Sequence, residues 1–200
     1  QENADQLKRA RIVYGVPEEI IVAIIGVESI YGKRTGSFRV IDALYTLAFE
    51  MPERAAYFRA ELEQFLLLTR ENALDPLTMK GSFAGAIGMP QFMPTSYRRF
   101  AVDFDGDARI NLWESVPDII GSVANYLSHF GWVPGQPIVV PARIGGTEYK
   151  DIVDKGFKPH LTLAQMLAKG IEPTETVPLE LVAGLFALEI EQCQEYWLAM

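Results

Sequence analysis

The sequence predicts a mainly α-helical protein with a small α+β appendage at its C-terminal end. Over residues 1–132, apolar side chains recur with helical spacing, and prolines and glycines stand where helices begin and end. Past Trp132 the composition changes, because prolines and glycines separate short β-branched pieces. We therefore expect a helical body over 1–132 and a small α+β subdomain over 133–200 that is incomplete at its C-terminus.

The body is expected to contain helices whose boundaries the sequence marks. Pro17 suits the first turn of a helix, and Gly32 stands just past its predicted end. Residues 41–49 form a short apolar segment. The expected helices are Leu7–Val13, Pro17 to about Gly32, Pro52 to about Arg70, and Pro117–Phe130.

The appendage is expected to combine one small helix with strands. Thr162 is a candidate N-cap for a helix over 163–169, and Gly170 is a candidate stop. Residues 179–190 and 196–200 have the composition of two strands of a hairpin or small sheet.

Composition excludes several classes of function. The chain has 200 residues, 49% of them hydrophobic, which suffices for a real core. A net charge of −8 without a long basic run argues against nucleic acid as a partner. No apolar stretch reaches the length of a membrane span. The lone Cys193 excludes an internal disulfide, and His129 and His160 lie too far apart in sequence to suggest a zinc site.

Glu28 is the first candidate for chemistry. It stands at the end of a helix whose preceding run, residues 20–25, is wholly apolar. A helix that is hydrophobic all round is normally buried, and burial of a carboxyl group raises its pKa and favours the neutral acid. General acid catalysis requires such a neutral acid near pH 7. The alternative is a glutamate at a helix end that points into solvent.

The second candidate is a glycine-rich segment over residues 81–97. Its glycines at 81, 85 and 88 fit neither a dinucleotide fingerprint nor a Walker loop. Gln91 stands between prolines and beside Phe92, which places a hydrogen-bonding amide next to an apolar plate. Sugars are bound by such combinations. The alternative is a loop whose glycines only allow tight packing.

The third candidate is an acidic loop with the spacing of an EF-hand. Ala108 holds the sixth position, where the standard loop has glycine, and roughly 1 kcal/mol of backbone strain is expected there. The alternative is an acidic, solvated turn. Acidic residues hold loop positions one, three, five and twelve, which are Asp103, Asp105, Asp107 and Glu114.

Together these segments resemble the membrane-bound lytic transglycosylase B family. The resemblance runs in order from about Gly15 to Trp132. It rests on four motifs: Gly-Val-Glu-Ser at 26–29, the segment 81–94 with its Pro-Gln-Phe-Met-Pro, Ile-Asn-Leu-Trp at 110–113, and Ile-Gly-Ser-Val-Ala-Asn-Tyr at 120–126.

The resemblance implies a lysozyme-like catalytic core that acts on bacterial peptidoglycan in the periplasm. Members are often lipid-anchored to the outer membrane. We expect no organic cofactor, a monomer, and proteins of cell-wall synthesis as candidate partners.

The same resemblance implies the roles of individual residues. Glu28 is the sole catalytic acid and base: it protonates the oxygen of the MurNAc-β-1,4-GlcNAc bond and then accepts a proton from the muramyl C6 hydroxyl, which closes a 1,6-anhydro ring. The residues expected in the saccharide cleft are Ser82, Gln91, Phe92, Arg54 and Tyr57.

The resemblance also implies a structural Ca²⁺ in a loop over 103–118. Asp118 is the expected closing carboxylate and Glu114 is its rival. The other expected ligands are Asp103, Asp105, Asp107 and the carbonyl of Arg109.

Two other functions stay open. A hydrolytic muramidase needs a second carboxylate and an attacking water; Asp42 and Glu50 are present, but no pattern singles out either one. A non-catalytic peptidoglycan-binding module is the expectation if truncation inactivates the chain, because the family continues past the strand at 196–198 into a segment that lines the cleft.

Overall fold

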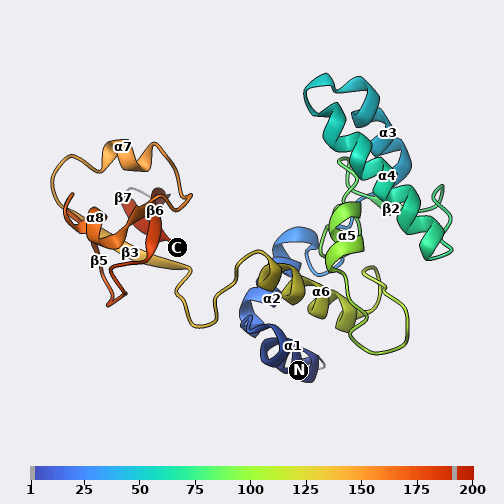
Figure 1. Cartoon of the computed structure of the whole chain (residues 1–200), viewed down its shortest axis with the longest axis horizontal. Helices are drawn as coiled ribbons and strands as arrows, with labels where there is room; N and C mark the ends of the chain where they lie inside the picture. The colour runs from blue at the N-terminus through green and yellow to red at the C-terminus, as the bar shows by residue number, and fades with distance from the viewer. Residues whose placement is uncertain (1–2, 191–192) are drawn as a thin grey trace. The chain divides into compact units, whose positions relative to one another are not determined.

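The computed structural model describes residues 3–190 and 193–200, which divide into two compact units. The first unit ends at Pro134, and the second begins at Gly135. The sequence placed this division between residues 132 and 133. The path of the chain through each unit is shown in Figure 1.

The first unit is built mainly from helices around one hydrophobic core. Helix α3 packs along α4, and α6 packs against α1 and α2 (Figure 1). Buried side chains from these helices, such as Ile21, Leu44, Phe65 and Ile119, form the core. The elements are α1 (Ala4–Tyr14), α2 (Glu18–Ser29), β1 (Phe38–Arg39), α3 (Val40–Glu50), the 3-10 helix η1 (Pro52–Arg54), α4 (Ala55–Glu71), β2 (Lys80–Gly81), α5 (Pro94–Phe100) and α6 (Val116–His129).

The helices predicted from sequence are present, but some of their boundaries differ. Helix α1 begins at Ala4, three residues before its predicted start. Helix α2 ends at Ser29 rather than near Gly32, because the backbone already turns left-handed at Ile30, with a φ of 51°. The Ser29 hydroxyl stabilises this end, since it accepts a hydrogen bond from the Gly32 backbone N–H at 3.0 Å. Glu28 therefore lies in the last turn of the helix.

The glycine-rich segment packs its backbone directly against neighbouring backbone and side chains. A Cβ on Gly36 would lie 2.0 Å from the carbonyl oxygen of Gly81, where β1 pairs with β2. A Cβ on Gly85 would lie 2.4 Å from Leu44, and one on Gly88 would lie 2.5 Å from the Leu112 carbonyl oxygen. The alternative of tight loop packing is thus correct for these glycines.

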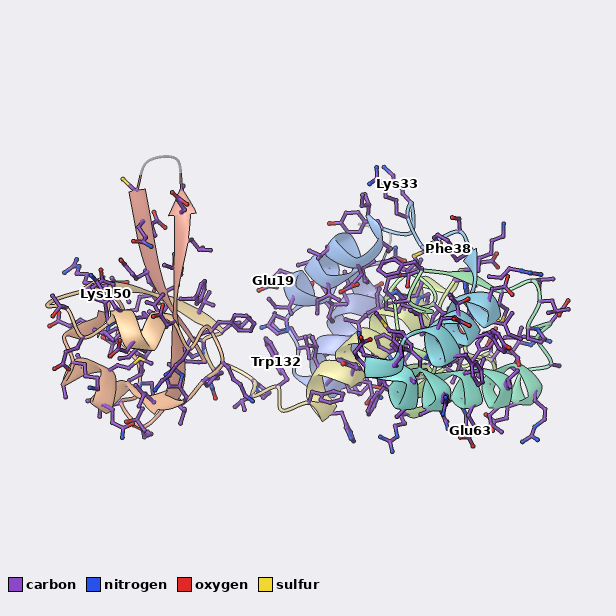
Figure 2. All side chains as sticks on the ribbon, turned by 90° about the horizontal axis from the view of Figure 1, so that it is seen from above. Glu19, Lys33, Phe38, Glu63, Trp132 and Lys150 are labelled. Carbon is purple, nitrogen blue, oxygen red and sulfur yellow. The ribbon has the colours of Figure 1, made fainter. Side chains whose placement is uncertain are left out.

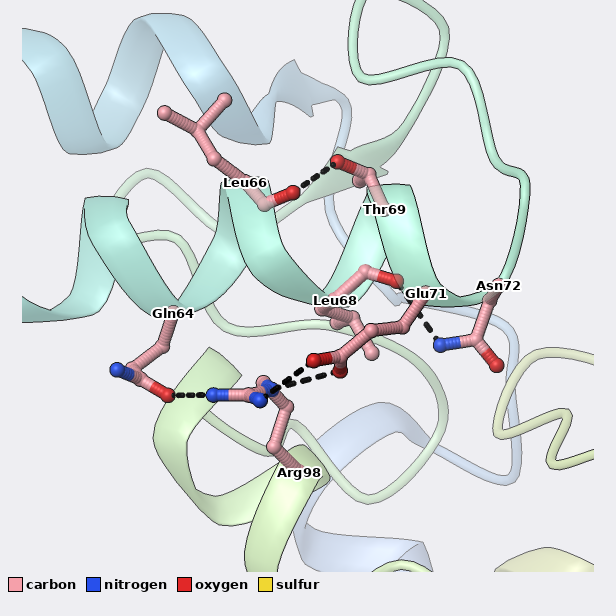
Figure 3. A network of polar contacts seen from close by, with 7 residues as sticks. All are labelled: Gln64, Leu66, Leu68, Thr69, Glu71, Asn72 and Arg98. Carbon is pink, nitrogen blue, oxygen red and sulfur yellow. Dashed lines mark hydrogen bonds and ion pairs between the residues drawn. The ribbon is translucent and has the colours of Figure 1, made fainter.

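Helix α5 was not predicted, and side chains from α4 fix it in place. Arg98 of α5 donates hydrogen bonds to both carboxylate oxygens of Glu71, at 2.9 and 2.7 Å, and a further one to Gln64 (Figure 3). The hydrogen bonds from Arg98 hold the pKa of the Glu71 carboxyl below its usual range. These contacts join the C-terminal half of α4 to α5.

The second unit is a five-stranded antiparallel sheet with two short helices. Strand order is β4-β6-β7-β3-β5. The predicted hairpin is present, since β6 and β7 pair from Gly184↔Ala199 to Ile190↔Cys193. The elements are β3 (Val139–Ile144), α7 (Lys150–Val153), β4 (Leu161–Thr162), α8 (Leu163–Leu167), β5 (Ile171–Pro173), β6 (Val182–Ile190) and β7 (Cys193–Ala199).

The predicted cap of the small helix is also present. The Thr162 hydroxyl accepts a hydrogen bond from the backbone N–H of Gln165 at 3.2 Å, and the Gln165 side chain accepts one from the Thr162 N–H at 2.9 Å. This reciprocal pair is a capping box. Helix α8 ends at Leu167, two residues before the predicted end.

Among the described helices of both units, none combines the length and the hydropathy that crossing a bilayer requires.

Because Gly36 lies so close to Gly81, adding a single methyl group at Gly36 is predicted to destabilise the protein strongly. Gly36→Ala should lower the free energy of unfolding by about 1–3 kcal/mol more than Gly131→Ala, as measured by urea denaturation. Both glycines have a similar positive φ, 96° and 93°, but nothing lies within 4 Å of a Cβ on Gly131. Equal losses of unfolding free energy in the two variants would show that the backbone contact between Gly36 and Gly81 does not exclude a methyl group.

Candidate active site and metal centre

Glu28 is exposed, so the expected burial of this carboxylate is wrong and the alternative of an exposed glutamate is correct. Helix α2 buries one face only, through Ile21, Ile25 and Ser29. Val27 is 84% exposed although it is apolar. The apolar run therefore did not indicate burial on all sides, because other segments cover only the face of α2 that carries Ile21, Ile25 and Ser29.

Glu28 and its neighbour one turn earlier, Ile24, line a pocket of about 260 Å³. Residues 90–93, Ser96 of α5 and three residues of α6 line the same pocket. Two predicted saccharide-binding residues, Gln91 and Phe92, thus lie in the same pocket as Glu28. The residues of α6 that line it are Val123, Tyr126 and Leu127.

Contacts within the protein hold the side chains of Gln91 and Phe92 in place without a ligand. Gln91 has a φ of 51°, and its Nε2 donates hydrogen bonds to the carbonyl oxygens of Thr35 and Gly88, at 3.1 and 2.8 Å. The amide nitrogen is therefore already used, which leaves the amide oxygen for a ligand. The Phe92 ring is 7% exposed and packs against Tyr126, with ring centroids 5.1 Å apart.

The other predicted cleft residues are not among those that line this pocket. The Ser82 hydroxyl oxygen accepts hydrogen bonds from the backbone N–H groups of Ala84 and Ala86, so it closes a turn. The Arg54 guanidinium lies 4.9 Å from the ring centroid of Tyr57. Burial, followed by the charge of Glu61, raises the pKa of the Tyr57 hydroxyl. A role in saccharide binding stays a prediction for Ser82, Arg54 and Tyr57.

Sequence reasoning missed two polar residues of the pocket, Ser96 and Tyr126. Tyr126 follows Val123 by three residues on the predicted helix, and this spacing could have placed both on one face. Ser96 carries no comparable signal, because α5 itself was not predicted.

The acidic loop brings three carboxylates together. Oxygen atoms of Asp103, Asp105 and Asp118 lie within 4.8 Å of one another. Calcium binds oxygen at 2.3–2.6 Å, so two ligands of one ion lie no more than about 5 Å apart, and these three fit that requirement. Asp107 and Glu114 are outside the cluster. Of the two candidates for the closing position, Asp118 is the one that meets the other carboxylates.

Asp118 also holds the ends of the loop together. It is 1% exposed, and its two oxygens accept hydrogen bonds from the backbone N–H groups of Phe104 and Asn111, at 2.8 and 2.9 Å. Asp103 is likewise preorganised as an anion. Partial desolvation raises the pKa of its carboxyl, but hydrogen bonds from the N–H groups of Gly106 and Ala108 outweigh it, and the pKa lies below its usual range.

Ala108 takes the left-handed conformation that the sixth position of an EF-hand loop requires. Its φ is 68°, and Gly106 nearby has a φ of 83°. The missing glycine has therefore not changed the local turn, and the strain expected from sequence is present in the backbone.

Comparison with known proteins places this chain in a family. The helical body with its carboxylate pocket has a lysozyme-like fold. All of residues 1–200 match the family described as the transglycosylase SLT domain. The chain belongs to this family.

One curated relative is the membrane-bound lytic murein transglycosylase B of Escherichia coli (strain K12). It is 48% identical over 193 residues, which are 96% of this chain and 52% of the relative. The chain thus spans about half the length of that protein.

Solved structures agree in fold over the whole chain. Soluble lytic transglycosylase SltB1 from Pseudomonas aeruginosa matches with a TM-score of 0.93 and 46% identity, over 100% of this chain and 66% of that one. Escherichia coli Slt35 in complex with calcium matches with a TM-score of 0.89 and 46% identity, over 100% and 62%. Pseudomonas aeruginosa SltB3 in complex with NAG-NAM-pentapeptide matches with a TM-score of 0.84 and 33% identity, over 99% and 53%.

The strained turn at Ala108 predicts that an alanine-to-glycine substitution stabilises the protein there, whereas the same substitution inside a helix destabilises it. Ala108→Gly should raise the free energy of unfolding by roughly 0.5–1 kcal/mol in the presence of a chelator, because glycine tolerates the left-handed conformation. Ala60→Gly, at an exposed position inside α4, should lower it by about 0.5–1 kcal/mol. Chemical denaturation measures both. A loss of stability in Ala108→Gly would argue against strain at this turn.

Proposed function

We propose that this chain is a peptidoglycan lytic transglycosylase that cleaves the MurNAc-β-1,4-GlcNAc bond and leaves 1,6-anhydromuramyl products. One observation carries the proposal beyond family membership. Among the residues that line the pocket of the described chain, Glu28 is the only carboxylate.

A single carboxylate suits a reaction in which water does not attack. Glu28 acts first as the acid and donates its proton to the oxygen of the glycosidic bond. The bond between that oxygen and the muramyl anomeric carbon then breaks. The resulting Glu28 carboxylate accepts the proton of the muramyl C6 hydroxyl, whose oxygen bonds to the anomeric carbon. The ring closes, and the proton balance of Glu28 is restored.

The hydrolytic alternative requires a second carboxylate across the scissile bond, about 5–9.5 Å from the first. Neither candidate from the sequence lines the pocket. Asp42 forms an ion pair with Arg39, at 2.6 Å, in the first turn of α3. Glu50 is the last residue of α3. The geometry therefore favours the non-hydrolytic reaction.

The pocket offers the contacts that a saccharide needs. Gln91 supplies an amide oxygen and Phe92 an apolar surface. Ser82, Arg54 and Tyr57, which do not line the pocket, are proposed as further contacts of the saccharide on the basis of the family resemblance. The ligands of related structures support this class of substrate, since Slt35 was solved in complex with bulgecin A and SltB3 in complex with NAG-NAM-pentapeptide.

The acidic loop is proposed to be an EF-hand-like site for one structural Ca²⁺. The clustered carboxylates Asp103, Asp105 and Asp118 are its proposed core ligands. Asp107, which lies outside that cluster, and the Arg109 carbonyl stay ligands proposed from the family resemblance alone. Support comes from the carboxylate cluster and from the calcium complex of Slt35. The ion would offset the repulsion between carboxylates that the fold holds together.

The site of action follows from the substrate. Peptidoglycan as substrate supports a place in the periplasm, and the Escherichia coli relative is named as membrane-bound. We propose that a lipid anchor attaches the full-length protein to the outer membrane. We further propose that the protein acts as a monomer and meets proteins of cell-wall synthesis there.

Replacement of Glu28 tests the proposed reaction. Glu28→Gln should reduce release of soluble fragments from purified peptidoglycan by roughly a hundredfold or more, because an amide cannot donate the required proton. Glu19→Gln makes the same change at an exposed position in the first turn of α2 (Figure 2), nine residues before Glu28 and outside the pocket lining, and should leave release unchanged. Substantial turnover by Glu28→Gln would contradict the assignment.

Calcium removal tests the proposed metal site. Saturating Ca²⁺ at a hundred times its Kd should stabilise the protein by about 2.7 kcal/mol relative to the chelated form. Thermal unfolding would detect this as a rise in Tm. Asp105→Asn should diminish the effect, whereas Glu114→Gln should keep it. A Tm that is the same with Ca²⁺ and with chelator would rule out the site.

A further inference from the structure

Helix α4 contains a buried glutamate that the proposed reaction does not use. Glu61 is 5% exposed and is the only glutamate among the buried residues of the described chain. Carboxylates are rarely buried unless their charge is compensated, since desolvation of a charge is costly. Asp118, the other buried carboxylate, closes the acidic loop. Glu61 belongs to no such cluster, so its burial needs a different explanation.

Glu61 forms a hydrogen bond with the start of α5. Its Oε2 accepts a hydrogen bond from the backbone N–H of Thr95 at 2.9 Å. Thr95 is the second residue of α5, and first-turn N–H groups have no partner within their own helix. The preceding residue, Pro94, has no N–H to offer. The carboxylate of α4 therefore holds the first turn of α5 through one of its N–H groups.

That first turn forms part of the pocket wall. Ser96 follows Thr95 directly and lines the same pocket as Glu28. Within the part of the chain that the structure describes, the Ser96 hydroxyl has no hydrogen-bond partner in the protein, whereas the Gln91 amide nitrogen has two. A serine hydroxyl can both donate and accept a hydrogen bond. Ser96 is thus available to a polar group of a ligand.

Glu61 also lies one helical turn after Tyr57, on the same face of α4. The charge of Glu61 is close enough to raise the pKa of the Tyr57 hydroxyl, after the larger effect of burial. The carboxylate therefore interacts both with a residue predicted in the saccharide cleft and with the helix that carries Ser96.

We propose that Ser96 is a further substrate-binding residue of the Glu28 pocket and that Glu61 positions it through the Thr95 backbone N–H. The ligand group is a hydroxyl or an N-acetyl amide of the glycan chain, because either can exchange a hydrogen bond with serine. The inference rests on the proposed function and names a contact within the same pocket.

Binding to an inactivated chain tests the contact without turnover. The probe is a soluble GlcNAc–MurNAc tetrasaccharide, titrated by calorimetry into the Glu28→Gln protein. Adding Ser96→Ala should weaken binding roughly three- to tenfold, the range for one lost hydrogen bond. Ser128→Ala, at an exposed position of α6 outside the pocket lining, should leave the affinity unchanged. Unchanged affinity after Ser96→Ala, or no binding of the tetrasaccharide at all, would overturn the proposal.

The role of Glu61 is tested in the same background. Glu61→Ala should weaken binding by a similar factor, and Glu61→Gln should restore most of it, because the amide oxygen still accepts the Thr95 hydrogen bond. Glu63→Ala is the matched control, since Glu63 is exposed on the same helix (Figure 2). Thermal unfolding of each variant separates a loss of fold from a loss of binding. Glu61→Gln keeps the test usable if Glu61→Ala does not fold.

A double-mutant cycle decides whether Glu61 acts through Ser96. If it does, the combined loss in Glu61→Ala/Ser96→Ala is clearly smaller than the product of the single losses. Losses that multiply would overturn the positioning role. Failure of the proposed reaction is distinguishable: protein with Glu28 intact would release no anhydro products, while the tetrasaccharide would still bind in a way that depends on Ser96.

Discussion

The pocket depends on how closely the backbone of residues 81–92 packs against the rest of the first unit. Gly36 meets Gly81 at a distance that leaves no room for a methyl group, and Gly88 meets the backbone at Leu112 in the same way. The Gln91 side chain adds a tie to the Thr35 carbonyl. These contacts fix residues 90–93, which line the same pocket as Glu28. This part of the pocket is therefore set mainly by backbone positions, which tolerate little change.

A second constraint is the abrupt end of α2. Ile30 and Tyr31 both have positive φ values, 51° and 54°, which non-glycine residues adopt at a cost of about 1–3 kcal/mol each. The turn ends the helix directly after Ser29, which is buried, while Glu28 stays exposed in the pocket. The Glu28 carboxylate is exposed to solvent. In the proposed reaction, the bound saccharide displaces water from this carboxylate.

Local signals in the sequence predicted much of the fold. Prolines, caps and apolar spacing gave α2, α4 and α6, and Thr162 gave the cap of α8. They failed where the contacts are long-range. The exposure of Glu28 depends on which side of α2 other segments cover, and α5 is held by Glu61, Gln64 and Glu71 of a distant helix. Among the features of the candidate site, sequence patterns identified Glu28, Gln91 and the acidic loop. The cluster of Asp118 with Asp103 and Asp105 agrees with the family resemblance, whereas spacing alone favoured Glu114.

The mass of the products formed from intact peptidoglycan tests the central claim most directly. The wild-type chain should release muropeptides that are lighter by one water than the corresponding hydrolysis products and that resist reduction by borohydride, because the muramyl end is closed as a 1,6-anhydro ring. Products with the full mass of a hydrolysed chain and a reducible end would contradict the single-carboxylate account. They would show that water reaches the anomeric carbon opposite Glu28.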